Sequence, residues 1–207
     1  MKFLGLIRMK DIQVEVVDGS YAIPCGMPVG IYLKSKGVMV IGTGQVTNDT
    51  GNVVEPAYGL LKSGDYIQTV DGEDLEDKND LVDAVSASDG KTLALGIRRD
   101  GRRIEVDMTP VLAEDGSYKL GAWVRDDTRG IGTMTYVDMN GKFGALGHGI
   151  SDSDTGELVD IEGGELYETQ ILGIEKGQTG KTGVMSGVIY YGKGTKLGEV
   201  KENTAEG

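Results

Sequence analysis

The side chain best suited to proton transfer in this sequence is its one histidine, His148, in the segment GALGHGI. An imidazole gains and loses a proton near neutral pH, so histidine is the commonest general base in proteins. Glycines at positions 144, 147 and 149 surround His148 and would let a ligand approach the backbone closely. By pattern alone, however, a lone histidine in a glycine-rich turn is more often structural or merely exposed.

A histidine base needs a hydroxyl nucleophile and, usually, an orienting third group. Asp152, Asp154 and Asp160 follow His148 closely, but acidic residues beside glycine are usually solvated, so we expect an acidic surface turn. Ser186, in VMSGVI, offers a hydroxyl further along the chain. Residue type therefore favours proton transfer at His148 without identifying its partners.

No metal or other cofactor is expected. Cys25 is the only cysteine, and together with His148 it supplies too few ligands for zinc. The acidic turn at 152–156 lacks the glycine and the distal glutamate of a calcium loop. EKGQTGKT, at 175–182, has glutamate where a phosphate-binding loop needs its first glycine, and no helix is expected after it. GTGQVT, at 42–47, lacks the third glycine of a dinucleotide-binding fingerprint.

Bulk composition limits the partners of this chain. A formal net charge of −12 and a pI near 4.5 argue against nucleic acid and against charge-driven binding to an anionic membrane. The apolar run at 3–7 is too short for a signal-peptide core, and no stretch is long enough to span a bilayer. The opening carries no leader, so we expect a soluble fragment whose membrane association would require a segment absent here.

The elements that must position these side chains are mainly β-strands, with one or two short helices. Thirty-four glycines in 207 residues favour short strands and many turns. From alternation and turn signals, the first half is expected to contain strands at 11–17, 66–70, 91–98 and 102–108. Two further strands are expected within 30–42, around a turn at Lys34–Gly37, and a loop is expected at 47–52. A helix is expected at 80–87, with Asn79 as its N-cap. Asp71-Gly72 and Asp100-Gly101 are tight-turn signals.

The second half has no convincing helix. WVR, IGTMTYVD and KFGAL each have strand character, Asn140-Gly141 signals a type I′ hairpin, and strands are expected at 158–161 and 166–174. This pattern is typical of part of an antiparallel β-barrel of the trypsin-like kind. Pro110 and the polar stretch 113–117 place a boundary near 110–118.

The first half resembles the circularly permuted PDZ domain of bacterial proteases. The residues that carry the resemblance are GDYIQTVDGEDL at 64–75 and the hairpin RRDGRRIEVDM at 98–108. The resemblance implies that a peptide carboxylate is bound by the backbone of a loop formed by Met27, Pro28, Val29, Gly30 and Ile31. It also implies that Leu81 and Val85 line the side-chain pocket, although apolar helix residues are core by default.

The second half is similar to the opening of the SpoIVB peptidase domain. The segments that carry this resemblance are YKLGAWVRDDTRGIGTMTYVD at 118–138, FGALGHGISDSDTG at 143–156 and ILGIEKGQTGKTG at 171–183. This family of stage IV sporulation serine peptidases has a PDZ domain just before the peptidase domain. The resemblance implies that His148 is the catalytic histidine. It also implies signalling proteolysis during sporulation, outside the cytoplasm in the forespore intermembrane space.

The nucleophile of that family lies in a GMSGSP motif well after the histidine. VMSGVI lacks the following Ser-Pro, so we expect Ser186 not to be the nucleophile and the chain to stop before it. The expected organisation is an N-terminal strand and loop at 1–26, a PDZ-like domain at 27–112, and the first part of a peptidase domain at 118–207. The expected function is a serine endopeptidase, inactive as this chain alone. The alternative is a non-catalytic PDZ peptide-binding or regulatory protein.

Overall fold

The computed structural model describes residues 2–3, 7–8, 19 and 21–207, so the strand predicted at 11–17 lies outside the described residues. The one helix and the strands of this part are β1 (Lys2–Phe3), β2 (Ile7–Arg8), β3 (Ala22–Thr43), β4 (Val46–Thr47), β5 (Val53–Val54), β6 (Tyr66–Val70), β7 (Glu73–Asp74), α1 (Lys78–Ala87), β8 (Leu93–Arg99), β9 (Arg102–Met108), β10 (Val111–Leu112), β11 (Tyr118–Lys119), β12 (Ala122–Asp138), β13 (Phe143–Gly144), β14 (Ile161–Tyr167), β15 (Thr169–Glu175), β16 (Val184–Ile189) and β17 (Lys196–Val200). The prediction of a mainly β fold with a short helix is confirmed.

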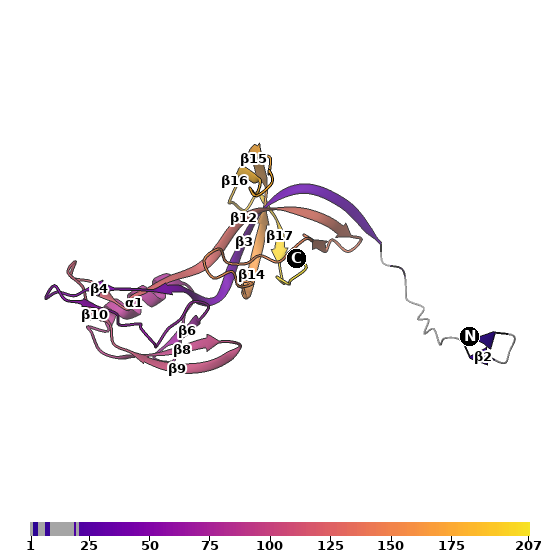
Figure 1. Cartoon of the computed structure of the whole chain (residues 1–207). Helices are drawn as coiled ribbons and strands as arrows, with labels where there is room; N and C mark the ends of the chain where they lie inside the picture. The colour runs from indigo at the N-terminus through magenta and orange to yellow at the C-terminus, as the bar shows by residue number, and fades with distance from the viewer. Residues whose placement is uncertain (1, 4–6, 9–18, 20) are drawn as a thin grey trace.

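Two lobes lie end to end and are joined by the long antiparallel pair of β3 and β12 (Figure 1). The main sheet runs in the order β13-β12-β3-β6-β8-β9, with β14 and β17 attached through β3. All of its strand pairs are antiparallel, and in the part of the chain that the structure describes they form an open sheet. One lobe carries α1, and the other carries His148.

The helical lobe is built around an apolar core between α1 and the strands β3, β6, β8 and β9. Its buried residues are Val38, Val40, Ala57, Leu61, Ile67, Val70, Leu81, Val85, Leu93, Leu95, Ile97, Met108 and Leu120. Leu81 and Val85 are one helical turn apart, so they share the face of α1 that packs on the sheet. Burial of these side chains, at roughly 1.5–3 kcal/mol each, is the main stabilising contribution here.

The helix begins two residues earlier than predicted, and Asn79 is not its cap. Asp77 is the N-cap, because its carboxylate accepts hydrogen bonds from the backbone N–H groups of Asn79 and Asp80. The Asp80 carboxylate in turn accepts from the Asp77 N–H, at 3.3 Å. Two aspartates therefore satisfy the free amides at this end reciprocally.

Two of the predicted tight turns have the expected left-handed backbone. Asp71 and Asp100 both have φ of 50°, and the glycines that follow them also have positive φ. These values fit two-residue type I′ connections between Val70 and Glu73 and between Arg99 and Arg102. Strands β6 and β9 accordingly have the predicted bounds.

The turn before β6 is held by a buried ion pair. Asp65 is fully buried, and its carboxylate accepts from Arg99 Nε at 2.7 Å and from Arg99 Nη2 at 2.5 Å. It also accepts from the Lys62 N–H at 2.9 Å, and Arg99 donates to the Leu60 carbonyl at 2.8 Å. This bidentate contact ties the turn at 62–65 to the end of β8.

The predicted carboxylate-binding loop, Met27, Pro28, Val29, Gly30 and Ile31, is wrong, because these residues form part of β3. Ile31 lies opposite Gly130 of β12 on one edge and opposite Leu166 of β14 on the other. Strand β12 pairs with the whole segment along one edge, and β14 pairs with Gly30 and Ile31 along the other, so the segment is paired strand and not a carboxylate-binding loop. Val29 and Ile31 instead form the second core, together with Leu33, Met134 and Leu166.

The two strands predicted within 30–42 are one strand with a wide bulge. Asp127 of β12 lies opposite Lys34, whereas Arg125 lies opposite Met39, so residues 35–38 are looped out of the pairing. The Ser35 hydroxyl donates to the carbonyls of Gly37 and Asp126, at 2.6 and 3.0 Å. The predicted domain start at residue 27 thus falls within a continuous strand, and that division stays a prediction.

The second half also departs from the predicted elements. WVR and IGTMTYVD belong to one strand, β12, rather than two, because β3 pairs with it along most of its length. Asn140 does not have the positive φ that a type I′ turn requires; in this turn the left-handed residue is Gly141, with φ of 80°. Within residues 21–207, no helix is long and apolar enough to cross a bilayer.

Candidate functional site

His148 lies on the surface, in an irregular bend between β13 and β14. Gly147 before it has φ of +142°, a conformation that side-chain-bearing residues rarely adopt. Gly149 after it has no room for a Cβ, which would clash with the Thr204 carbonyl and with Leu158. The two glycines that flank His148 therefore have different roles: Gly147 allows a positive φ, and Gly149 allows the C-terminal segment to approach closely.

The C-terminal segment holds this bend from outside. The N–H of Gly147 donates to the Glu206 carbonyl at 2.9 Å, and that of Gly149 donates to the Ala205 carbonyl at 3.2 Å. Next to these, the Asn203 side chain bonds to the backbone of Ile150. The sequence gives no sign of this role for the polar tail, because nothing in its composition indicates a contact more than fifty residues away.

The ring of His148 makes one hydrogen bond, between Nδ1 and the Gly149 carbonyl, at 2.9 Å. A carbonyl can only accept, so Nδ1 carries the proton in this contact. In the neutral ring Nε2 then has a free lone pair, and the exposed ring can present it to a partner. This is the tautomer that a general base requires at Nε2.

The acidic turn after His148 is not the solvated turn that the sequence predicted. Asp152 is buried and its carboxylate accepts from Arg125 Nη1, while Arg125 Nη2 lies 2.8 Å from Asp154 Oδ2. The N–H groups of Asp154 and Thr155 also donate to Asp152, at 2.9 and 3.0 Å. Burial alone would raise the pKa of Asp152, but the two N–H groups and the guanidinium outweigh it and hold this pKa below its usual value.

Asp160, the third acidic candidate, faces the helical lobe. Its Oδ2 lies 2.6 Å from Arg98 Nη2, and the Arg98 guanidinium stacks over the Tyr66 ring at 4.7 Å. Within residues 21–207, no carboxylate is hydrogen-bonded to the His148 ring. The group that orients this imidazole is therefore a backbone carbonyl.

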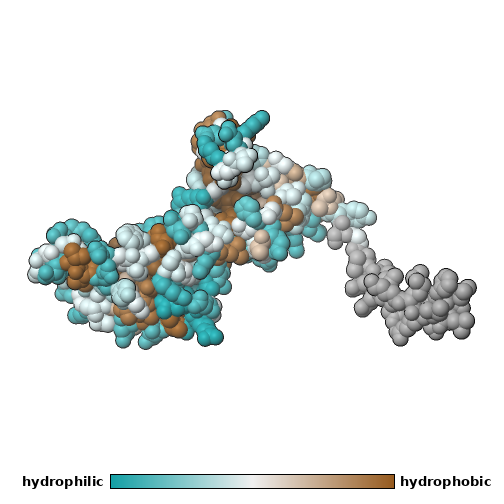
Figure 2. All heavy atoms as spheres, in the orientation of Figure 1, coloured by the Kyte–Doolittle hydropathy of each residue, from teal (hydrophilic) through white to brown (hydrophobic). Residues whose placement is uncertain are grey.

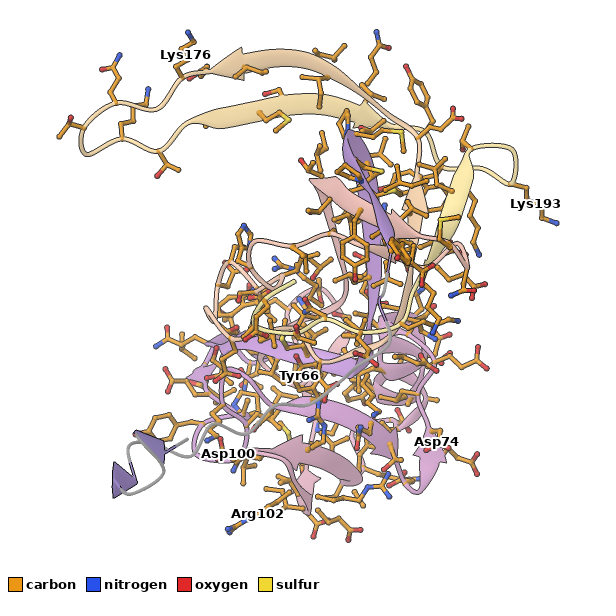
Figure 3. All side chains as sticks on the ribbon, turned by 90° about the vertical axis from the view of Figure 1, so that its right-hand side faces the viewer. Tyr66, Asp74, Asp100, Arg102, Lys176 and Lys193 are labelled. Carbon is orange, nitrogen blue, oxygen red and sulfur yellow. The ribbon has the colours of Figure 1, made fainter. Side chains whose placement is uncertain are left out.

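Ser186 lies in β16, which pairs with β15 opposite Gly173 in a hairpin that projects from the sheet. Figure 3 shows this hairpin, with Lys176 at its tip, standing away from the lobe that contains Tyr66. Among the described residues, no hydrogen bond joins Ser186 to His148. The structure thus does not bring these two side chains together as a nucleophile–base pair.

A surface groove of about 260 Å³ lies between α1 and the segment 118–124. The segment is tied along the helix by the Tyr118 hydroxyl, which donates to Asp89 at 3.1 Å, and by Lys78, whose Nζ lies 2.8 Å from Asp126. The apolar residues that line the groove are Val46, Leu81, Val82, Val85, Leu120, Ala122, Trp123 and Val124.

The groove has a buried floor and an exposed rim. Leu81 and Val85 are core residues that also line it, so their predicted role in a side-chain pocket stays a prediction. Val82 and Trp123 are 56% and 61% exposed and stand at its rim. Figure 2 shows apolar surface on this lobe and on the projecting hairpin. The wall opposite α1 is formed by residues 118–124, and not by the predicted loop at 27–31.

The sequence comparisons each match a part of the chain. Residues 116–207, a little under half of the chain, match the family model described as SpoIVB peptidase S55. Curated relatives include a putative zinc metalloprotease, LL2128, of Lactococcus lactis, 40% identical over 83 residues, and the regulator of sigma-W protease RasP of Bacillus subtilis, 34% identical over 76 residues. These stretches are 39% and 37% of this chain but 19% and 17% of the relatives, so the chain spans about a fifth of each.

Among solved structures, the chain is similar to the PDZ domains of the SdrC-like proteins of Listeria monocytogenes and Listeria innocua. Sequence identity is 20% and 21%, and the TM-score is 0.36 in both cases. The similar region covers 43% of this chain and 87% and 93% of those domains.

The structure defines a mainly β protein whose described residues contain one helix. Its residues 116–207 are similar to the SpoIVB peptidase S55 family, a match that covers a little under half of the chain.

Proposed function

We propose that this chain carries the general-base part of a serine endopeptidase site of the SpoIVB type, with His148 as the base. The observation that carries the proposal is the hydrogen bond from His148 Nδ1 to the Gly149 carbonyl, which leaves Nε2 of an exposed ring free. In acyl transfer, such a nitrogen takes the proton of the attacking hydroxyl and later gives it to the leaving amine.

We propose that Ser186 is not the nucleophile of this site. Its place in the projecting hairpin and the lack of the family motif around it support this proposal. A base without its nucleophile loses the acyl chemistry, since the two groups act as a unit. We therefore propose that this chain is inactive alone. By its family, the role would be signalling proteolysis in sporulation, outside the cytoplasm in the forespore intermembrane space.

The second part of the proposal is that the groove beside α1 binds an extended peptide or protein segment. Its apolar floor and its exposed rim at Val82 and Trp123 suit an aliphatic side chain. Such binding would serve substrate recruitment or regulation in cis. The same observation supports the alternative of a non-catalytic peptide-binding protein, so the catalytic role of His148 must be tested separately.

The test compares His148→Ala with Ser186→Ala in the whole gene product, using hydrolysis of a protein substrate as the measurement. We expect His148→Ala to reduce kcat/KM by about 10³-fold or more, and Ser186→Ala to leave it within about twofold. We also expect no labelling of the present chain by a fluorophosphonate. Full activity of His148→Ala would refute the base assignment, and labelling that Ser186→Ala abolishes would refute our exclusion of Ser186.

A further inference from the structure

One peptide group connects the histidine ring to a side chain from the C-terminal segment. The carbonyl of Gly149 accepts from His148 Nδ1 at 2.9 Å, and the N–H of the same peptide group, on Ile150, donates to Asn203 Oδ1 at 2.8 Å. A trans peptide is planar and its C=O and N–H point in opposite directions. The His148 ring and the Asn203 side chain therefore bond to opposite edges of this peptide group.

Asn203 is itself held in one orientation. Its Nδ2 donates to the carbonyls of Ile150 and Val159, both at 2.8 Å. Two acceptors face the nitrogen and one donor faces the oxygen, so only one assignment of the amide satisfies all three contacts. The side chain is half-buried, which shields these bonds from competition with water.

We propose that Asn203 is a positioning residue for His148 and acts through the Gly149–Ile150 peptide group. This inference rests on the proposed role of His148 as base. By accepting from Ile150, the amide fixes the direction of the Gly149 carbonyl. It also polarises the peptide group, because hydrogen bonds in a chain strengthen one another. The carbonyl then keeps the proton on Nδ1 and the lone pair on Nε2, as an orienting carboxylate does in a catalytic triad.

We call the path from Asn203 through the Gly149–Ile150 peptide group to His148 the relay. Nitrogen NMR of the imidazole tests it directly, because His148 is the only histidine in the chain. In the unaltered protein with a neutral imidazole, we expect Nδ1 to have the chemical shift of a protonated nitrogen and Nε2 that of an unprotonated one. In Asn203→Ala, the two shifts should move towards each other as both tautomers become populated. Asn79→Ala, on the exposed first turn of α1, is the matched control and should leave both shifts unchanged.

A second variant distinguishes the relay from a purely structural role, in which Asn203 only holds the backbone of Ile150 and Val159 in place and does not act on the tautomer. Asn203→Asp keeps the oxygen that accepts from Ile150, but loses both Nδ2 donors and places an oxygen against two carbonyls. The relay predicts that Asn203→Asp retains the fixed tautomer that Asn203→Ala loses. A purely structural role would make the aspartate at least as damaging as the alanine.

Two results would overturn the proposal: unchanged shifts in Asn203→Ala, or equal loss of the tautomer in both variants. Neither result depends on hydrolysis. Conversely, an active His148→Ala enzyme would refute the proposed function while leaving the relay intact.

Discussion

At the residue scale, the proposed proton-transfer site at His148 differs from a Ser-His-Asp arrangement in the group that faces Nδ1. Here that group is the Gly149 carbonyl, at 2.9 Å. A neutral carbonyl can select the tautomer, but it compensates the charge of an imidazolium less than a carboxylate does. The buried carboxylate of Asp152, four residues after the histidine, pairs with Arg125 instead. Its role is to hold the turn that follows the histidine.

Replacement of Asp152 therefore tests stability and not chemistry. We expect Asp152→Asn to lower the free energy of unfolding by about 2 kcal/mol, since it breaks a buried ion pair whose arginine is partly exposed. Asp154→Asn is the control, because Asp154 meets the same guanidinium from a 48% exposed position. It should cost less than about 1 kcal/mol. Denaturant unfolding measures both values, and equal losses would contradict the assignment.

The lowered pKa of Asp152 determines how the stability difference between the unaltered protein and Asp152→Asn depends on pH. A carboxyl whose pKa is lower in the folded state stabilises it above the unfolded pKa, about 3.9 for aspartate. That contribution is lost as pH falls through the folded pKa. The gap between the unaltered protein and Asp152→Asn should thus be constant from neutrality to about pH 5 and shrink below about pH 4. A gap that widens on acidification would contradict the sign.

At the element scale, α1 and β12 are the pair that matters for binding. The helix presents Val82 at the rim of the groove, and β12 presents Trp123 opposite it. Trp123 lies so close to Gly44 that a Cβ there would clash with its indole ring. The aromatic wall of the groove thus requires a glycine in the neighbouring segment, a dependence that single-strand patterns do not reveal.

Trp123 is the only tryptophan, so its fluorescence reports directly on the groove. Titration with an extended peptide that ends in an aliphatic residue should change the Trp123 emission, and this change should saturate. Val82→Lys should weaken peptide binding by about tenfold, since a charge at an apolar contact costs more than 1 kcal/mol. Exposed Val53 on β5 provides the control, Val53→Lys. An amidated peptide tests whether the carboxylate is recognised. Saturation unaltered by Val82→Lys would place the peptide elsewhere.

At the scale of the whole molecule, the two lobes depend on the bulge at 35–38 where β3 passes between them. Gly37 has φ of +105°, and a Cβ there would lie 2.7 Å from the Ile67 carbonyl oxygen. On the facing strand, Arg125 contacts the turn after His148 and Asp126 contacts α1. Neighbouring residues of β12 therefore hold both lobes.

Substitution at this joint should be costly. We expect Gly37→Ala to lower stability by about 2–3 kcal/mol, through left-handed strain of about 1 kcal/mol plus the backbone clash. Gly51→Ala separates the two effects, because Gly51 has φ of +79° but nothing within 4 Å of an added Cβ. It should cost about 1 kcal/mol. Thermal unfolding of both variants measures the difference, and equal costs would show that the clash is relieved without penalty.

The local features of the chain could be predicted from sequence wherever neighbouring residues alone produce them. Strands β6 and β9 have the predicted bounds, because the residue types of Asp71-Gly72 and Asp100-Gly101 favour left-handed two-residue turns. The glycine-crowded setting of His148 was likewise visible from its neighbours. The helix start was wrong by two residues because Asp77, and not Asn79, accepts from the free amides at the start of the helix.

Long-range pairing decided the rest. Residues 27–31 have the composition of a loop, yet they become a central strand because β12 and β14 supply partners about 100 and 135 residues away. Asp152 is buried because Arg125 reaches it from another strand, and Asn203 reaches Ile150 across 53 residues. By itself, the sequence determined the mainly β class, the two Asp-Gly turns and the one histidine. Only the tertiary structure decided which atoms face that ring, because the carbonyl, the amide and the tail that hold it meet only when the chain has folded.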